Sequence, residues 1–377
     1  MKLNRLPAAY YRGGTSRAIM FKEHDLPKDR KLWDSIFLGA IGSPDRNGRQ
    51  LDGMGGGISS LSKVCVVGKS QHESGADVDY TFVALGVKTA EVDYSSNCGN
   101  MTSAIGPFAI NSGVVDAKNV PMSKDGHAVV RIHNTNTGKI IDATFPLDGD
   151  EAASHGDLAI DGVDGTAARI ELAFLDPAGS KTGKLMPTGN PCDVIEGVQA
   201  SLIDCGNPCC FVHASDLGVD GTILPDAMEA HPDLLPRLDG IRRKASVMMG
   251  LSTDEASASA SIPKVAMVSS PTGHRIPSGE GVDPTSVDVV VRAISVGQPH
   301  RAVPITVAMA IAAASRIEGS TVNAVMGAGN VDPKGLTIGH SSGMIMVGAN
   351  FDEEGSLMNA TVFRTARRLM DGNVYWK

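Results

Sequence analysis

The chain of 377 residues exceeds the size that one hydrophobic core usually serves, and its length predicts two domains of about 150–200 residues each. Its formal charge of −8, with no basic stripe along the sequence, argues against nucleic acid as a partner. The N-terminus lacks an apolar signal core and no run of about 20 uncharged apolar residues occurs, so we expect no membrane segment and a cytoplasmic protein with reduced thiols.

Glycine, proline and cysteine narrow the expected class further. The 43 glycines and 20 prolines predict many turns between short strands, with few helices. The six cysteines form no C-x-x-C pair and show no zinc-binding spacing with histidine, so we expect no metal site.

The first elements in the chain lead into a turn with exposed backbone donors. Residues 6–11 have the pattern of a strand, and residues 12–16 (RGGTS) that of a tight turn in which Thr15 and Ser16 add hydroxyl groups. A plain hairpin turn is an equally good interpretation of this motif. Residues 31–40 then predict a short amphipathic helix.

A lysine follows a glycine-rich stretch. Residues 50–57 (QLDGMGGG) contain too much glycine for a regular element, and strands are expected at 64–67 and 77–83. Lys63 therefore lies where a strand begins beside a loop that can approach a ligand closely, although a solvated surface lysine is the simpler interpretation.

The stretch 92–113 (VDYSSNCGNMTSAIGPFAINSG) places a thiol between a strand and a helix. Residues 92–95 predict the end of a strand, and an apolar helix is expected from about 103 to 111. Cys98 then precedes a helix N-terminus, where unpaired N–H groups and the helix dipole stabilise a thiolate or a bound anion. The alternative is a buried structural cysteine in a tight turn. Pro107 is expected to kink or interrupt the helix.

The rest of the first half and the start of the second half are predicted to be mainly strands. Strands are expected near 128–133 and 139–145, and the turn at 187–191 (PTGNP) is expected to end the first half. Further strands are expected at 198–203 and 210–212.

Three segments follow in the second half. Residues 234–241 have helical apolar spacing, so the basic cluster 242–244 is expected on the solvated face of that helix. The Ser/Ala-rich segment 252–261 is expected to be a surface loop. Residues 304–316 predict a helix, with Pro304 at its first position and Gly319 as a stop signal.

The two apolar helices predict a common architecture for both halves. The helix at 304–316 is apolar on every face and must be buried, which requires a sheet wrapped around it, and the helix at 103–111 has the same character. If the two helix N-termini face one another, the space between them would suit a multiply anionic small molecule.

Several ordered motifs carry a resemblance to a known family. These are RGGTS at 12–16, GSPD at 42–45, QLDGMGGG at 50–57, Ser62-Lys63, DVDYTF at 77–82, NCGN at 97–100, GPFAI at 106–110, PTGN at 187–190 and RTARRLMDG at 364–372. They resemble the methylaconitate cis–trans isomerase family, which includes methylitaconate isomerase and oxalomesaconate tautomerase, and the similarity runs essentially from end to end.

The resemblance implies an α+β fold of the diaminopimelate epimerase-like type. Two pseudo-symmetric domains are expected, each a curved, mainly antiparallel sheet wrapped round a central helix. The expected divisions are an N-terminal domain at 1–186, a second domain at 187–355 and a C-terminal tail at 356–377 that returns to the first domain.

The resemblance also implies roles for individual residues. A lysine and a cysteine at the positions of Lys63 and Cys98 are the expected proton-transfer pair. The residues expected to bind substrate are Thr15, Ser16, Ser62, Asn97, Gly99, Asn100, Ser103 and Thr306. Neither a metal nor an organic cofactor is expected.

One departure distinguishes the chain from the amino-acid epimerases of the same fold, which place a second catalytic cysteine before the second central helix. Here residues 301–306 read RAVPIT, without a thiol, and the other cysteines of the second half, at 192, 205, 209 and 210, are expected to be structural.

Three interpretations of the function remain. We favour a cofactor-independent isomerase of an unsaturated di- or tricarboxylate such as methylaconitate, aconitate, methylitaconate or oxalomesaconate, because a double-bond shift needs a base near neutral pH and fixed donors for the charge that develops. The alternatives are an epimerase or racemase of amino or hydroxy acids and a non-catalytic polycarboxylate-binding protein. A homodimer is the expected assembly.

Overall fold

The computed structural model describes residues 4–94, 97–259, 262–295, 297–327, 329, 331–332 and 335–377. The chain forms two compact units. Unit 1 comprises Met1–Leu175 with Phe363–Lys377, and unit 2 comprises Asp176–Val362. The sequence predicts divisions after residues 186 and 355, whereas the observed divisions follow residues 175 and 362.

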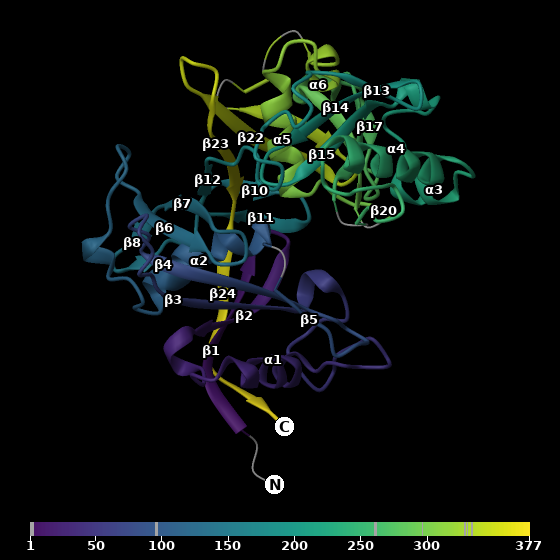
Figure 1. Cartoon of the computed structure of the whole chain (residues 1–377). Coiled ribbons are helices and arrows are strands. Elements are labelled where there is room, and N and C mark those ends of the chain that lie inside the picture. Colours follow the sequence, from purple (N-terminus) through teal and green to yellow (C-terminus); the bar gives the residue numbers. More distant parts are fainter. Residues whose placement is uncertain are drawn as a thin grey trace. The chain divides into compact units, whose positions relative to one another are not determined.

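Unit 1 is built on one sheet. Its strands, in spatial order, are β24 (Ala366–Trp376), β1 (Asn4–Gly13), β2 (Ser16–Lys22), β3 (Lys63–Lys69), β4 (Val78–Leu85), β6 (Ala128–Asn134), β7 (Lys139–Phe145) and β12 (Ile170–Leu175). The β2–β3 and β4–β6 pairs are parallel and the others antiparallel. In Figure 1 the C-terminal strand β24, in yellow, runs beside the N-terminal strand β1, in purple.

Short strands complete unit 1. They are β5 (Val92–Asp93), which pairs with the end of β4, and the hairpins β8 (Leu147–Asp148) with β9 (Glu151–Ala152) and β10 (Leu158–Ile160) with β11 (Val163–Ala167).

Helix α2 (Gly99–Asn111) is the central helix of unit 1. It contacts β1, β2, β3, β6, β7, β12 and β24, and every residue from Met101 to Ile110 is buried. A sheet that touches one short helix with so many strands must curve around it. Helix α1 (Trp33–Ile41) packs on the opposite face of the sheet, where Ile36 and Phe37 join an apolar cluster with Ile19 and Val64.

Two expectations for α2 were wrong. The helix begins at Gly99, before residue 103, because the polar residues of its first turn have no apolar pattern that would reveal them in the sequence. Pro107 lies inside the helix without interrupting it. Helical stability in a folded protein comes mainly from packing, and the complete burial of this helix outweighs the loss of one backbone hydrogen bond.

Unit 2 is built on a second run of paired strands. Its strands, in spatial order, are β13 (Asp193–Ile195), β14 (Val198–Asp204), β15 (Pro208–His213), β16 (Lys264–Ser269), β19 (Val289–Ser295), β21 (Leu336–His340), β22 (Gly343–Phe351) and β23 (Leu357–Arg364). The short strands are β20 (Gln298–Pro299), which pairs with β19, and the hairpin of β17 (His274–Arg275) with β18 (Gly281–Val282). The helices are α3 (Pro225–Ala230), α4 (Leu234–Met248), α5 (Ile305–Ser315) and α6 (Thr321–Ala324).

The two units repeat one topology. From β1 to β12 the successive pairs are antiparallel, parallel, antiparallel, parallel, antiparallel and antiparallel, and the pairs from β14 to β23 follow the same order. Helices α1 and α4 connect the second and third strands of their units, and the central helices α2 and α5 follow the fourth. The predicted fold of two pseudo-symmetric domains is confirmed.

Three details differ from the expectations for the second half. Pro304 is the N-cap of α5, with extended ψ of 137°, and Ile305 is the first helical residue. Arg242 is buried and forms an ion pair with Asp239 at 2.7 Å, and that carboxylate compensates the buried charge, whereas Arg243 is exposed and Lys244 is partly exposed. Residues 253–257 form an exposed loop, and positions 260 and 261 lie outside the described residues.

Within the described ranges, every helix is too short or too polar to cross a bilayer.

Candidate active site

Cys98 is the N-cap residue of α2. Its backbone is extended (φ −109°, ψ 99°), its side chain caps no backbone donor and it is partly exposed. The first backbone N–H groups of a helix have no partner within the helix, and they concentrate partial positive charge beside the thiol. Cys65, Cys205, Cys209 and Cys210 are buried instead, so the interpretation of Cys98 as a buried structural cysteine is wrong.

Thr102 fixes the loop that carries Cys98. Its Oγ1 lies 3.1 Å from the carbonyl oxygen of Cys98 and 3.3 Å from Oδ1 of Asn97, and its backbone N–H donates to the same carbonyl at 2.9 Å. Asn97, Gly99 and Asn100 are, like Cys98, partly exposed, whereas the helix is buried from Met101 onward. The NCGN motif therefore forms the accessible N-terminal end of a buried helix.

Lys63 is the first residue of β3 and is only 8% exposed, so the interpretation as a solvated surface lysine is wrong. Its Nζ lies 5.3 Å from the centroid of the Phe82 ring, which offers the ammonium group a cation–π contact. A lysine is almost never fully buried without a compensating partner.

The charges of Lys63 and Cys98 both affect the buried thiol of Cys65. Cys65 lies two residues after Lys63 on the same face of β3, and its Sγ is 3.9 Å from the hydroxyl of Tyr80. Burial raises the pKa of the Cys65 thiol, the charge of Cys98 raises it further, and Lys63 opposes the rise. Burial, and then the charges of Cys65 and Cys98, raise the pKa of Tyr80. The charges of Lys63 and Cys98 thus act in opposite directions on one buried thiol.

A polar network surrounds the first turn of α2. Nδ2 of Asn100 donates to Oγ1 of Thr15 at 3.1 Å, and Nε of Arg364 donates to Oδ1 of Asn100 at 3.3 Å. Burial lowers the pKa of Arg364 to about 10, although the charge of Asp161 opposes the change. Nη1 of Arg12 donates to the carbonyls of Gly14 and Thr365 at 3.0 Å. The network supplies two guanidinium groups near the helix N-terminus, where anions are favoured.

The hydroxyls of Ser62 and Ser103 are buried and bonded within the protein. Ser62 Oγ lies 2.7 Å from Oε1 of Gln50 and 2.8 Å from the carbonyl of Ile58, so it holds the glycine-rich loop. Ser103 Oγ donates to the carbonyl of Asn100 at 2.7 Å, and Ser16 is 3% exposed. Contact of these serines with substrate stays a prediction.

Thr306 lies in unit 2, at the second position of α5, and is partly exposed. Its Oγ1 accepts a hydrogen bond from Nδ2 of Asn207 at 3.4 Å. The expectation that the starts of α2 and α5 face one another stays a prediction.

Sequence reasoning did not assign a role to Arg364 or to Arg12. Both belong to quoted motifs, RTARRLMDG and RGGTS, so the signal was present. Their positions beside the first turn of α2 depend on contacts between residues far apart in the chain, 353 positions in the case of Arg12 and Thr365.

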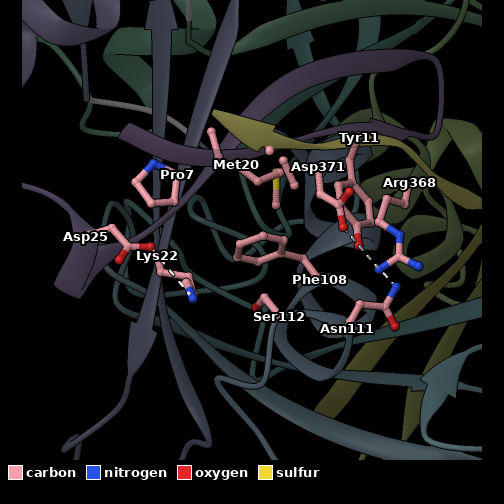
Figure 2. Close-up of a pocket in the computed structure, with 13 residues that line it drawn as sticks. Pro7, Tyr11, Met20, Lys22, Asp25, Phe108, Asn111, Ser112, Arg368 and Asp371 are labelled. Atoms are coloured by element: carbon pink, nitrogen blue, oxygen red, sulfur yellow. Dashed lines mark hydrogen bonds and ion pairs between the residues drawn. The ribbon is translucent and has the colours of Figure 1, made fainter. Parts of the chain in front are cut away.

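A separate cavity of about 300 Å³ lies toward the C-terminal end of α2. Figure 2 shows Phe108 and Met20 in its wall, with Tyr11 and Asn111 joined by a hydrogen bond of 3.1 Å, and with Arg368 and Lys22 at its margin. Its lining includes none of the residues that the sequence predicts for the active site.

The duplicated sheet-and-helix units, with a thiol at the N-cap of one central helix, define an enzyme of the diaminopimelate epimerase-like fold. A crystal structure of methylitaconate-delta-isomerase is similar to the chain with a TM-score of 0.89 and 38% identity, covering 100% of this chain and 96% of that one.

Two characterised relatives are similar over nearly the whole length. The 3-methylitaconate isomerase of Eubacterium barkeri is 39% identical, covering 98% of this chain and 97% of the relative, and the 2-methyl-aconitate isomerase of Shewanella oneidensis is 38% identical, covering 98% and 96%. The profile of the PrpF protein family matches residues 3–377, and the chain belongs to this family. The predicted membership is confirmed, and the enzyme is an isomerase.

Proposed function

We propose that the enzyme moves a proton within an unsaturated di- or tricarboxylate, by an allylic double-bond shift or a cis–trans isomerisation, with Cys98 and Lys63 as proton-transfer groups and no cofactor. The observation that carries the proposal is the partly exposed Cys98 at the start of a buried helix, with Lys63 buried at the start of β3, a strand that the same helix contacts. The family members named above are isomerases of methylitaconate and 2-methylaconitate, and both names denote unsaturated polycarboxylates.

The chemistry assigns one role to each group. The thiolate of Cys98 removes a proton from a carbon next to the double bond, the C–H electron pair moves into the conjugated system, and a proton from the ammonium group of Lys63 forms the new C–H bond. The thiol then returns its proton to the lysine amine, which restores both groups. General acid and base groups of this kind contribute about 10²–10⁴-fold each to a rate.

The first turn of α2 would stabilise the negative charge. Proton removal spreads charge from the carbon onto the neighbouring carboxylate, and fixed donors lower the energy of such a state. The N–H groups of Gly99 and Asn100, which have no partner within the helix, are the donors that we assign to the carboxylates, together with Thr15 and Arg364 beside them.

The N-cap of α5 argues against the amino-acid epimerase alternative. Two-base racemisation by thiols needs a second cysteine, and Pro304 occupies the N-cap position in unit 2 that Cys98 occupies in unit 1. Proline has neither a side-chain base nor a backbone N–H.

Turnover in deuterium oxide tests the function. Methylitaconate, cis- and trans-aconitate and a set of L-amino acids are incubated with the enzyme, and ¹H NMR follows double-bond position and deuterium on carbon. We expect a shifted or isomerised double bond in one of the acids, with deuterium at the newly protonated carbon. Racemisation of an amino acid with all the acids unchanged would contradict the proposal.

The proposal also covers the assembly of the enzyme and its location in the cell. We infer a cytoplasmic homodimer that binds neither nucleic acid nor membrane. All six cysteines are free thiols, and Leu369, Met370 and Tyr375 on β24 are exposed apolar residues suited to an interface. Light scattering on the purified protein measures the assembly, and a mass of 39.2 kDa in solution would contradict a dimer.

A further inference from the structure

One hairpin of unit 1 stands apart from the main sheet. Strands β10 and β11 pair with each other, and with no further strand in the described part of the chain. Ile160 is opposite Val163 in this pair. The two residues between them, Asp161 and Gly162, form the turn, and the φ of +87° at Gly162 suits so tight a connection. Both turn residues are exposed, whereas Ala167 at the base is buried. The hairpin is therefore held at its base and carries an aspartate at its tip.

The tip of this hairpin packs against the polar network at the start of α2. A Cβ added to Gly162 would lie 3.3 Å from Cγ2 of Thr15. Thr15 accepts a hydrogen bond from Asn100, and Asn100 accepts one from Arg364. Asp161 comes directly before this contact, and its charge raises the pKa of Arg364 against the effect of burial. The turn thus adds a carboxylate to the groups that we assign to the substrate.

Arg364 is the cation of this network on which the charge of Asp161 acts. Its side chain is partly exposed, Nε donates to Oδ1 of Asn100 at 3.3 Å and Nη1 donates to the carbonyl of Phe363 at 2.9 Å. Both acceptors are neutral, so they orient the guanidinium group without balancing its charge. The third nitrogen, Nη2, is a donor that a carboxylate can bind. The charge of Arg364 can be balanced by Asp161 or by a carboxylate of a bound acid.

We propose that Asp161 is a specificity-determining residue, which pairs with Arg364 in the substrate-free enzyme and gives way to a carboxylate of the unsaturated acid. This inference rests on the proposed function. A ligand gains from the exchange only if it brings a negative charge to Arg364, because a neutral group cannot replace the aspartate as the partner of a guanidinium group. The tip can move aside without breaking the main sheet, since the hairpin shares no ladder with it in the described residues.

Kinetics of Asp161→Asn test the exchange, because asparagine keeps the shape of the side chain and removes its charge. We expect KM for the acid to fall about two- to fivefold, the range for one exposed ion pair, with kcat nearly unchanged. Asp161→Glu keeps the charge and should stay close to the parent. Asp164→Asn, at another exposed aspartate of the same hairpin, makes the same change in net charge and should keep the KM of the parent.

A double variant shows whether the effect passes through Arg364. In an Arg364→Met background the guanidinium group is absent, so Asp161→Asn should no longer lower KM. An equal decrease in KM in that background would overturn the inference. So would an unchanged or higher KM in the single variant Asp161→Asn, because the aspartate would then not compete with the acid.

Sulfate gives a second measurement, which needs no turnover. Sulfate stabilises proteins in general by exclusion from their surfaces, so Tm in sodium sulfate is compared with Tm in sodium chloride of equal ionic strength. We expect Asp161→Asn to gain more from sulfate than the parent and Asp164→Asn gain, because its Arg364 can bind the anion. The same gain in all three proteins would overturn the inference. A parent that isomerises no polycarboxylate, with the difference in Tm present, would overturn the proposed function alone.

Discussion

Arg364 donates a hydrogen bond from Nε to Oδ1 of Asn100 over 3.3 Å, joining residues 264 positions apart in the sequence. Asn100 in turn donates to Thr15, so one amide ties the end of the chain and the first hairpin turn to the start of the central helix. The orientation of the helix start in unit 1 is therefore set from two distant segments.

Arg364→Met should lower kcat/KM, because it removes the hydrogen bond to Asn100. A hydrogen bond to a charged group is worth about 1.5–3 kcal/mol, so we expect kcat/KM to fall about 10–100-fold. Arg367→Met changes an exposed arginine of the same segment and should stay within about twofold of the parent, as most surface substitutions do. Equal activity of the two variants would show that Arg364 has no part in the site.

Cys98→Ser keeps the size of the side chain and replaces the thiol by a hydroxyl with a far higher pKa. We expect turnover to fall by about 10² or more, because a serine hydroxyl is a poor base near neutral pH. Cys192→Ser, at the other partly exposed cysteine, is the control and should remain active. Initial rates with the acid identified by NMR give the comparison, and parent-like turnover by Cys98→Ser would remove the thiol from the mechanism.

Lys63→Met should also lower turnover by about 10² or more, if the ammonium group supplies the second proton. Here the loss should lie mainly in kcat. Lys69, at the exposed far end of the same strand, provides the control Lys69→Met. A Lys63→Met enzyme with normal kcat would leave only a binding role for this lysine.

Gly14→Ala should disturb the site from the hairpin turn. Gly14 has φ +51°, and an added Cβ would overlap the side chain of Asn100. Gly75→Ala, at φ +68° with open space around it, isolates the backbone cost, which is about 1–2 kcal/mol. We expect Gly14→Ala to lose more stability than Gly75→Ala in urea unfolding and to lose activity as well. Equal losses would mean that the turn tolerates the extra methyl group.

His300 predicts a pH dependence of stability. Burial lowers its pKa below the ordinary value of 6.5, so between the lowered pKa and 6.5 the unfolded chain binds more protons than the folded one. The free energy of unfolding therefore falls as pH drops below about 6.5. Urea unfolding at pH 7.5 and 5.5 should show a smaller drop for His300→Gln than for the parent. His24→Gln, at a side chain that is 68% exposed, should leave the drop unchanged.

The sequence predicted what depends on local patterns. The all-apolar stretch in 304–316 required a buried helix, and every residue of α5 from Val307 to Ala314 is buried. Short apolar runs between turns located five strands of unit 1 (β1, β3, β4, β6 and β7) and two of unit 2 (β14 and β15) to within a few residues, whereas β16, β19, β21, β22 and β23 were not predicted. The motif NCGN before an apolar run placed Cys98 at a helix start, where the structure has it.

The sequence alone did not predict the features that depend on contacts between residues far apart in the chain. The burial of Lys63 follows from its place at the start of a strand covered on both sides, and no property of the lysine itself signals it. Arg242 was expected in solvent because the pattern of its helix cannot show that Asp239 compensates its charge.

The return of the last residues to unit 1 has a consequence for how the protein is made. Strand β24 pairs with β1 along its whole length, and Arg364 belongs to the same unit. A ribosome synthesises the 187 residues of Asp176–Val362 between the two parts of unit 1. Domains generally fold during synthesis from the N-terminus onward, but the sheet of unit 1 must wait until β24 has been synthesised. A nascent chain can therefore finish unit 2 before unit 1, and the sheet around α2 is complete only after both flanking segments have been made.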